Sequence, residues 1–166
     1  MKRLPLLLCV VVALLGGCKG KPKIVSDSDK LKAENLVSEA QFSMQIREYS
    51  RAEELFQKAI AVREGYPEYW VALGMARRRQ DNKDGARDAY KKALGFIEDR
   101  YAETKNEEDL GQKAWVLALL GHTDEAVQFL NKCLKDHPDS AYLKKMSAAN
   151  GLPHTFQTSD FKNLSI

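Results

Sequence analysis

The chain has 166 residues, with 26 Lys and Arg against 23 Asp and Glu, and a formal net charge of +3. Lys2 and Arg3 precede an apolar run, so without that segment 24 basic residues (26 less two) face 23 acidic ones. This near neutrality excludes a strongly basic surface for nucleic acid and an overall charge suited to acidic substrates.

The N-terminus has the pattern of a secretory signal. Met1-Lys2-Arg3 is followed by an apolar stretch of 14 residues from Leu4 to Gly17, shorter than the ~20 residues that cross a bilayer as a helix. Leu15-Gly16-Gly17-Cys18 resembles a bacterial lipobox. The resemblance implies that residues 1–17 are a lipoprotein signal peptide and that Cys18 becomes the N-terminal residue and carries a diacylglycerol. The alternatives are an ordinary signal peptide that ends near a cysteine and an uncleaved anchor.

Residues 18–28 are predicted to be a flexible tether next to the membrane. Lys19-Gly20-Lys21-Pro22-Lys23 breaks helices and carries lysines that can touch anionic headgroups. Lys19 directly after Cys18, rather than an aspartate, resembles lipoproteins that are passed on to the outer membrane. We therefore expect the bacterial cell envelope, and most strongly the periplasmic face of the outer membrane, as the location.

After the tether, a pattern of small, large and small residues recurs three times. In each copy the three positions have offsets of 0, 4 and 7, which places their side chains on one helical face. The copies follow one another at spacings of 34 and 40 residues: Ala52, Phe56 and Ala59; Ala86, Tyr90 and Ala93; Ala126, Leu130 and Cys133. A unit of this size cannot bury its apolar face alone, so the repetition predicts stacked helix pairs.

The second copy resembles a tetratricopeptide repeat. Trp70-Val71-Ala72-Leu73-Gly74 reproduces the W-x-x-L-G pattern of that family, and Ala86-x-x-x-Tyr90 follows. At the Trp and Gly positions the first copy has Leu36 and Ala40, the third has Leu110 and Ala114, and the third also has the closing Pro138. The resemblance implies an all-α, right-handed α-solenoid of about three helix pairs plus a C-terminal capping helix, which we assign to residues 29–150. The chain departs from the family at Arg77, where an aromatic residue is usual, in the missing closing proline of the first two copies, and in six extra residues before the third copy.

Start and stop signals predict where the helices lie. We expect them over 29–46, 50–63, 67–80, 84–103, 106–121 and 123–138, with the capping helix over 139–150. Ser26-x-x-Asp29, Ser50-x-x-Glu53, Asn106 and Thr123 are the predicted N-terminal caps. The extra residues, Tyr101 to Asn106, are interpreted as further turns of the fourth helix. Residues 151–166 show no helical period and are predicted to form an irregular tail.

In tetratricopeptide arrays the first helix of each pair lines a concave groove. The resemblance maps this lining onto Val37, Gln41 and Met44; Val71, Met75 and Arg78; and Gly111, Trp115 and Ala118. The surface is largely apolar and suits an amphipathic helix or an extended apolar segment, with Trp115 as an anchor. A clamp for a C-terminal carboxylate is not expected, because only Arg78 has the necessary charge. The alternatives are ordinary packing of Trp115 and Met75 between neighbouring helices, and occupation of the groove by the chain's own tail, residues 152–166.

Arg77-Arg78-Arg79 is the sharpest charge feature of the chain. Cations near the end of a helix suit its dipole, and three successive side chains point in different directions, so they do not form one patch. This structural role is the favoured interpretation, and an anionic site centred on Arg78 is the alternative.

Candidate catalytic and metal-binding groups are scarce in this sequence. His122, His137 and His154 lie in predicted turns and the tail without paired ligand spacing, and no zinc, phosphate-loop or nucleophile-elbow motif is present. Cys133 stands at the small-residue position of the third copy and is expected to be buried and unreactive. We therefore predict no enzyme, no metal and no cofactor.

Together these patterns predict a lipid-anchored protein–protein interaction adaptor of the bacterial envelope. The expected partners are a protein segment docked in the groove and the membrane, reached through the N-terminal lipid anchor. Nucleic acid and small-molecule substrates are not expected. Assembly of an outer-membrane, secretion or pilus complex is the expected setting. The alternative is a permanent structural subunit of an envelope complex, in which the convex and end surfaces pack and the groove captures no client.

Overall fold

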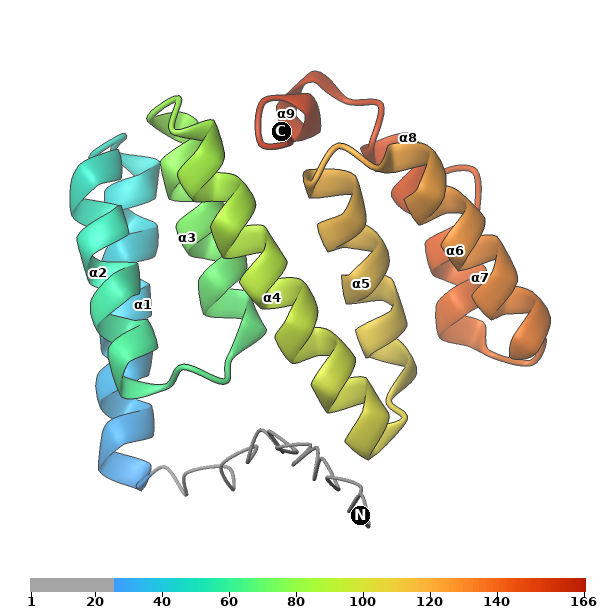
Figure 1. The fold of residues 1–166 in the computed structure, drawn as a ribbon, viewed down its shortest axis with the longest axis horizontal. Helices are drawn as coiled ribbons and strands as arrows, with labels where there is room; N and C mark the ends of the chain where they lie inside the picture. Colours follow the sequence, from blue (N-terminus) through green and yellow to red (C-terminus); the bar gives the residue numbers. More distant parts are fainter. Residues whose placement is uncertain (1–25) are drawn as a thin grey trace, which may run out of the picture.

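The computed structural model describes residues 26–166, and these form helices and their connections. The helices are α1 (Asp27–Gln45), α2 (Tyr49–Val62), α3 (Pro67–Arg79), α4 (Lys83–Thr104), α5 (Glu107–Leu119), α6 (Thr123–Asp136), α7 (Ala141–Ser147), α8 (Leu152–Thr155) and α9 (Ser159–Lys162) (Figure 1). The predicted signal peptide, Cys18 and the tether up to residue 25 lie outside the described residues.

Consecutive helices pack in pairs. α1 packs on α2, α3 on α4 and α5 on α6, and the pairs are joined by contacts of α2 with α3 and of α4 with α5. Figure 1 shows these pairs standing side by side in chain order. The predicted solenoid of helix pairs is therefore confirmed. α7 packs against both α5 and α6, as expected of a cap at the end of the array.

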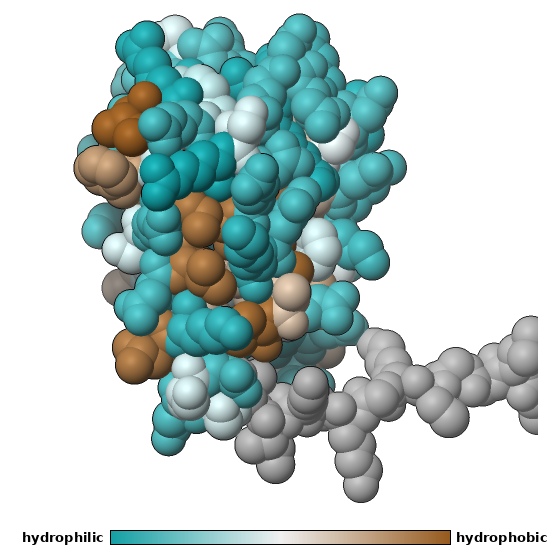
Figure 2. Space-filling view, turned by 90° about the vertical axis from the view of Figure 1, so that its left-hand side faces the viewer, coloured by the Kyte–Doolittle hydropathy of each residue, from teal (hydrophilic) through white to brown (hydrophobic). Residues whose placement is uncertain are grey.

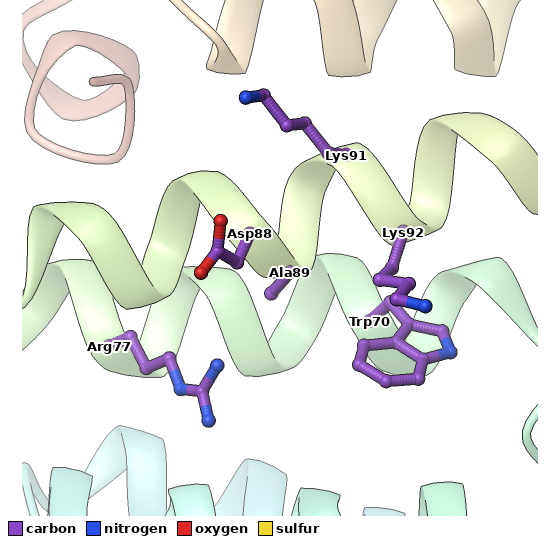
Figure 3. A pocket seen from close by; sticks show the side chains of 6 residues that line it. All are labelled: Trp70, Arg77, Asp88, Ala89, Lys91 and Lys92. Atoms are coloured by element: carbon purple, nitrogen blue, oxygen red, sulfur yellow. The ribbon is translucent and has the colours of Figure 1, made fainter.

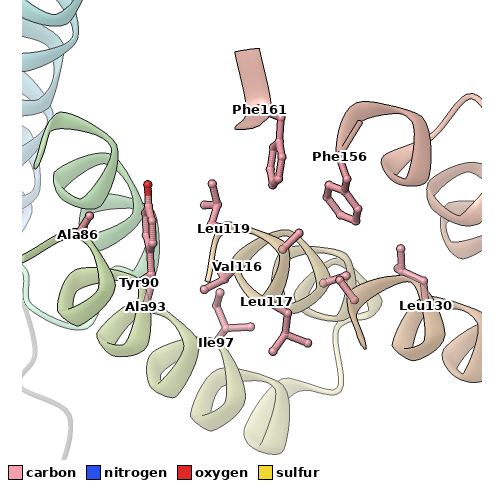
Figure 4. Close-up of a cluster of buried hydrophobic side chains, with 13 residues drawn as sticks. Ala86, Tyr90, Ala93, Ile97, Val116, Leu117, Leu119, Leu130, Phe156 and Phe161 are labelled. Carbon is pink, nitrogen blue, oxygen red and sulfur yellow. The ribbon is translucent and has the colours of Figure 1, made fainter. Parts of the chain in front are cut away.

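The small, large and small residues of the second helices form the interior. Phe56 of α2, Tyr90 of α4 and Leu130 of α6 are at most 1% exposed. Figure 4 shows Tyr90 and Leu130 in the largest cluster of buried side chains. Cys133 is 6% exposed and occupies the position that alanine holds in the other two copies. Burial raises the pKa of its thiol, which keeps the group protonated. The prediction that Cys133 packs as a small apolar residue is confirmed.

Of the four predicted helix caps, two are confirmed and two are wrong. The Ser26 hydroxyl accepts a hydrogen bond from the N–H of Asp29 (3.1 Å), and Asn106 Oδ1 accepts one from the N–H of Glu108 (3.1 Å). These bonds satisfy N–H groups that have no carbonyl partner within the helix. Thr123, in contrast, is the first residue of α6, and the residue before it makes no side-chain cap bond.

The predicted capping box at Ser50 and Glu53 is also wrong. α2 begins at Tyr49, so Ser50 already lies within the first turn. Ser50 Oγ donates to Gln80 Oε1 (2.9 Å), and Glu53 Oε1 accepts from Arg77 Nε (2.8 Å). Both side chains therefore join α2 to α3. Partners on the neighbouring helix have replaced the local backbone groups that the sequence pattern favours.

α4 is the longest helix, and its C-terminal part joins it to α5. The helix runs to Thr104, which confirms that most of the extra residues before the third copy are helical, and Lys105 ends it with a left-handed backbone (φ 55°). Just before these extra residues, Arg100 reaches Asp109 of α5, whose carboxylate is only 2% exposed. Arg100 Nε donates to Asp109 Oδ1 (2.8 Å). A buried carboxylate is tolerated when it is paired and hydrogen-bonded, so this contact fixes α4 against α5.

The C-terminal segment differs from the prediction in two respects. α7 is shorter than the expected 139–150, because the backbone turns to an extended conformation at Ala148 (ψ 154°). Residues 151–166 are not irregular throughout, since they contain α8 and α9, each of four residues. Such short helices are too brief to produce a hydrophobic period. Phe156 and Phe161 of this segment are 2% and 3% exposed, so burial against the repeats holds it in place.

Candidate interaction surface

The surface formed by α1, α3 and α5, here called the first-helix face, contains the positions that the resemblance assigned to a binding groove. Gln41 is exposed on this face. Val37, Met44, Val71 and Met75 are partly buried, and each packs against one of the two larger core clusters. The α1 and α3 parts of the face therefore keep some accessible apolar surface.

At the α5 part of the face, the chain's own tail covers Trp115. The Trp115 ring centroid lies 4.9 Å from that of Phe161 in an edge-to-face arrangement, and 6.2 Å from that of Phe156. In Figure 4 both phenylalanine rings point from the tail toward α5. The edge-to-face arrangement of Trp115 and Phe161 is one of the favoured aromatic geometries. Since Gly111 and Ala118 are also buried, the α5 positions of the predicted groove are all packed or covered.

Hydrogen bonds to the backbone hold residues 164–166 on three different helices. Tyr90 Oη donates to the carbonyl oxygen of Leu164 (2.8 Å), Arg78 Nε donates to that of Ser165 (2.7 Å), and the N–H of Ile166 donates to the carbonyl oxygen of Leu119 (2.9 Å). Burial raises the pKa of Tyr90, so its hydroxyl remains protonated and able to donate. The tail is thus bound through its backbone as well as through its aromatic side chains.

The tail divides the first-helix face into two parts. Arg78 and Trp115 contact the tail directly. Met75 lies one helical turn before Arg78 on α3, next to the covered part, whereas Val71 lies a further turn away. We call the remaining predicted groove residues the open part of the first-helix face: Val37, Gln41, Met44 and Val71. The sequence pointed to the tail as one possible occupant through its apolar residues, but it carried no signal for the backbone contacts.

The run Arg77-Arg78-Arg79 is tied into the fold at two of its three positions. Arg77 pairs with Glu53 of α2 and also donates from Nη1 to the carbonyl oxygen of Gly85 (3.1 Å). Arg78 donates to Ser165 and lies 3.5 Å from a carboxylate oxygen of Asp81. These partners agree with the structural interpretation of the run.

A pocket of about 440 Å³ between α3 and α4 was not found from the sequence. It is lined by Trp70, Arg77, Asp88, Ala89, Lys91 and Lys92 (Figure 3). Trp70 Nε1 donates to the carbonyl oxygen of Glu64 (2.8 Å), and its ring stacks on Phe96 at 6.3 Å. Arg77 is paired with Glu53 of α2. Trp70 and Arg77, the two α3 residues of the lining, therefore both hold α3 to neighbouring parts of the fold.

The histidines lie apart from one another. His122 and His137 each sit beside a single carboxylate, at 3.7 Å and 3.6 Å, and His154 is exposed on α8. Within residues 26–166, no cluster of three or more His, Cys, Asp or Glu side chains has the arrangement of a metal site. In the same residues, no helix combines the length and apolarity needed to cross a membrane.

Comparison with known families bears on the repeat pattern directly. Models of the tetratricopeptide repeat family match residues 67–99, which span α3 and most of α4, and residues 112–140, which span most of α5 and all of α6. These two stretches of the chain are thus similar to tetratricopeptide repeats. No curated protein gives a match to the chain.

The tetratricopeptide repeats indicate a protein–protein interaction adaptor, because stacked repeats of this kind present an extended surface to a partner. Tetratricopeptide proteins are generally scaffolds rather than enzymes.

The glycine of the W-x-x-L-G pattern is explained by the packing of α3 on α4. Gly74 lies against the ring of Tyr90, and a Cβ atom at Gly74 would overlap that ring.

Proposed function

We propose that this tetratricopeptide repeat protein is a lipid-anchored adaptor of the bacterial envelope, which docks one partner segment on the open part of the first-helix face. The observation that carries the docking proposal is the exposure of this surface. Gln41 is exposed and Val37, Met44 and Val71 are partly buried, whereas the tail covers the α5 end. The open part suits the apolar side of an amphipathic helix or an extended apolar segment, with Met44 adapting its shape. Assembly of an outer-membrane, secretion or pilus complex is the proposed setting.

Anchoring through Cys18 rests on the lipobox-like Leu15-Gly16-Gly17-Cys18 and on Lys19 after it. Cys18→Ala is expected to move the protein from the membrane fraction to the soluble fraction, because the diacylglycerol has no thiol to bind. Fractionation of cells after a high-salt wash measures this change. Cys133→Ala is the matched control and should leave the protein on membranes, since alanine already fills that position in the other repeats. Firm membrane association of Cys18→Ala would argue against lipidation at this residue.

Docking on the open part is tested by changing Gln41, which is exposed, and Val71, which is only partly buried, with a thermal melt to check the fold. Gln41→Lys combined with Val71→Thr is expected to lower recovery of the crosslinked partner about tenfold, because a charge and a hydroxyl would be desolvated against an apolar segment. Crosslinking in cells, followed by affinity purification and quantification of the partner, measures recovery. Gln128→Lys, at an exposed position of α6, is the control for the added charge.

The two candidate roles predict different results for that experiment. An adaptor that captures a partner on the open part loses the partner with Gln41→Lys and Val71→Thr and keeps it with Gln128→Lys. A permanent subunit that packs through its convex and end surfaces keeps the same partner with all three substitutions. That second result would contradict docking on the open part.

A further inference from the structure

The outward side of α1 carries large apolar side chains that remain accessible. Leu31, Phe42 and Ile46 are 60%, 57% and 47% exposed. With 3.6 residues per turn they share one side of the helix with three uncharged polar residues, which are also exposed. We call this set the α1 stripe: Leu31, Asn35, Ser38, Phe42, Gln45 and Ile46. Figure 2 shows hydrophobic surface gathered on the side of the molecule formed by the first helix pair.

The position of Phe42 is buried in both later repeats. The spacings of 34 and 40 residues make Ala76 of α3 and Val116 of α5 its equivalents, and these are 0% and 1% exposed. Ala76 lies in the core cluster that contains the buried residues of α1 and α2, and Val116 lies in the cluster that contains those of α4. In α3 and α5, this side of the helix therefore packs on the preceding helix pair.

Two other positions of the α1 stripe also have equivalents that contact the preceding helix pair. Ile46 corresponds to Gln80, which accepts a hydrogen bond from Ser50 of the preceding helix α2 (2.9 Å). Asn35 corresponds to Asp109, which is paired with an arginine of the preceding helix α4. Over Asn35, Phe42 and Ile46, the α1 stripe thus corresponds to the stacking face of the later repeats, at the one helix pair that has no other pair before it within residues 26–166.

The opposite end of the array does not offer a matching surface. There, α7 and the tail cover the last helix pair, and Lys144 and Lys145 of α7 are exposed. Stacking of copies head to tail would place the α1 stripe against these charges. Two α1 stripes, in contrast, are alike and carry no charge of their own, and a two-fold contact between them forms a closed dimer. The acidic residues that border the α1 stripe, Glu34 and Glu39, are paired with Arg63 and Arg51 of the same chain. We propose that the α1 stripe is a homodimer interface, on which the α1 helices of two copies pack antiparallel.

The apolar ends of the α1 stripe match in this arrangement. A two-fold axis that passes between Ser38 and Glu39 places Leu31 opposite Ile46 of the second copy and Asn35 opposite its Phe42. Ser38 then lies opposite Glu39, whose charge is paired with Arg51 of its own chain (2.6 Å). The small Ser38 side chain allows the helices to approach closely at the crossing point. All three exposed apolar residues are then covered. Because each copy contributes a small apolar area, the dimer is expected to be reversible.

Ser38→Cys tests this arrangement, since it places one thiol of each copy beside the axis. In cells that produce the full chain, we expect a short bismaleimide crosslinker to yield a species of twice the chain mass on a denaturing gel. Lys58→Cys, at an exposed position of α2 outside the α1 stripe, is the matched control. The unsubstituted chain reports any crosslinking through the native cysteines. Adding Phe42→Glu is expected to lower the crosslinked fraction about tenfold, because a charge is desolvated in the contact.

Phe42 is largely exposed, so Phe42→Glu should fold normally, which a thermal melt checks. Absence of the double-mass species with Ser38→Cys overturns the proposal. Its persistence with Phe42→Glu, or equal crosslinking with Lys58→Cys, does so as well. A crosslinked species of another mass assigns the α1 stripe to a different protein. Protection of the Ser38→Cys thiol from a soluble maleimide only while membranes are intact, without crosslinking, assigns it to lipid.

Discussion

Replacing Phe161 with alanine is expected to destabilise the folded chain by about 3 kcal/mol, the cost typical of removing a buried phenylalanine ring. The side chain is 3% exposed and contacts the rings of Trp115 (4.9 Å) and Phe156 (5.0 Å). Its loss removes the contact that holds α9 over α5. Urea denaturation measures the free energy of unfolding, and a red shift of tryptophan emission in a Trp70→Phe background reports the exposure of Trp115.

Lys162→Ala is the matched control for Phe161→Ala, because it changes an exposed residue of the same short helix. We expect it to alter the free energy of unfolding by no more than about 0.5 kcal/mol. Deletion of residues 152–166 should destabilise the repeats at least as strongly as Phe161→Ala, since it also removes Phe156 and the three backbone bonds. A deletion variant as stable as the full chain would show that the tail contributes nothing to the repeats.

Gly74→Ala is expected to destabilise the chain by about 2 kcal/mol through overpacking. The new methyl group would overlap the Tyr90 ring, which is fully buried, and the Tyr90 hydroxyl is held by the carbonyl oxygen of Leu164 (2.8 Å). The ring therefore has no free direction in which to retreat. Thermal and urea denaturation measure the loss. Gly95→Ala is the control, because a Cβ atom there meets nothing within 4 Å, and alanine in an exposed helix should be neutral or stabilising.

The third repeat suggests a compensating change for Gly74→Ala. At the positions of Gly74 and Tyr90 it has Ala114 and Leu130, both fully buried. In a double-mutant cycle, Gly74→Ala with Tyr90→Leu should therefore cost at least about 1 kcal/mol less than the sum of the two single changes. Additive costs would mean that the Gly74 backbone and the Tyr90 ring do not restrict each other.

The candidate site was predictable where it follows the repeat and not where it depends on the tail. The resemblance placed Val37 and Val71 on the first helices of successive pairs, and the structure has them on α1 and α3, where both are partly buried. It also placed Trp115 there as an anchor for a partner, but Phe156 and Phe161 already pack on that ring. Ring-to-ring contact between a repeat and an aperiodic segment leaves no pattern in the sequence, so this occupation could only be one of several hypotheses.

Repetition along the chain was sufficient to establish the helix pairs and the inward role of residues such as Tyr90 and Cys133. Each repeat must bury the same face against its neighbours. Within one helix this requirement produces small, large and small residues at offsets of 0, 4 and 7, which the sequence shows directly. Which polar groups the side chains reach was decided only in three dimensions, as Ser50 and Glu53 show by bonding to α3 instead of capping α2. The same holds for the tail, whose bonds to Tyr90 and Arg78 join residues 74 and 87 positions apart. Contacts at such separations depend on where the packed helices bring the backbone, and no local or periodic feature of the chain encodes them.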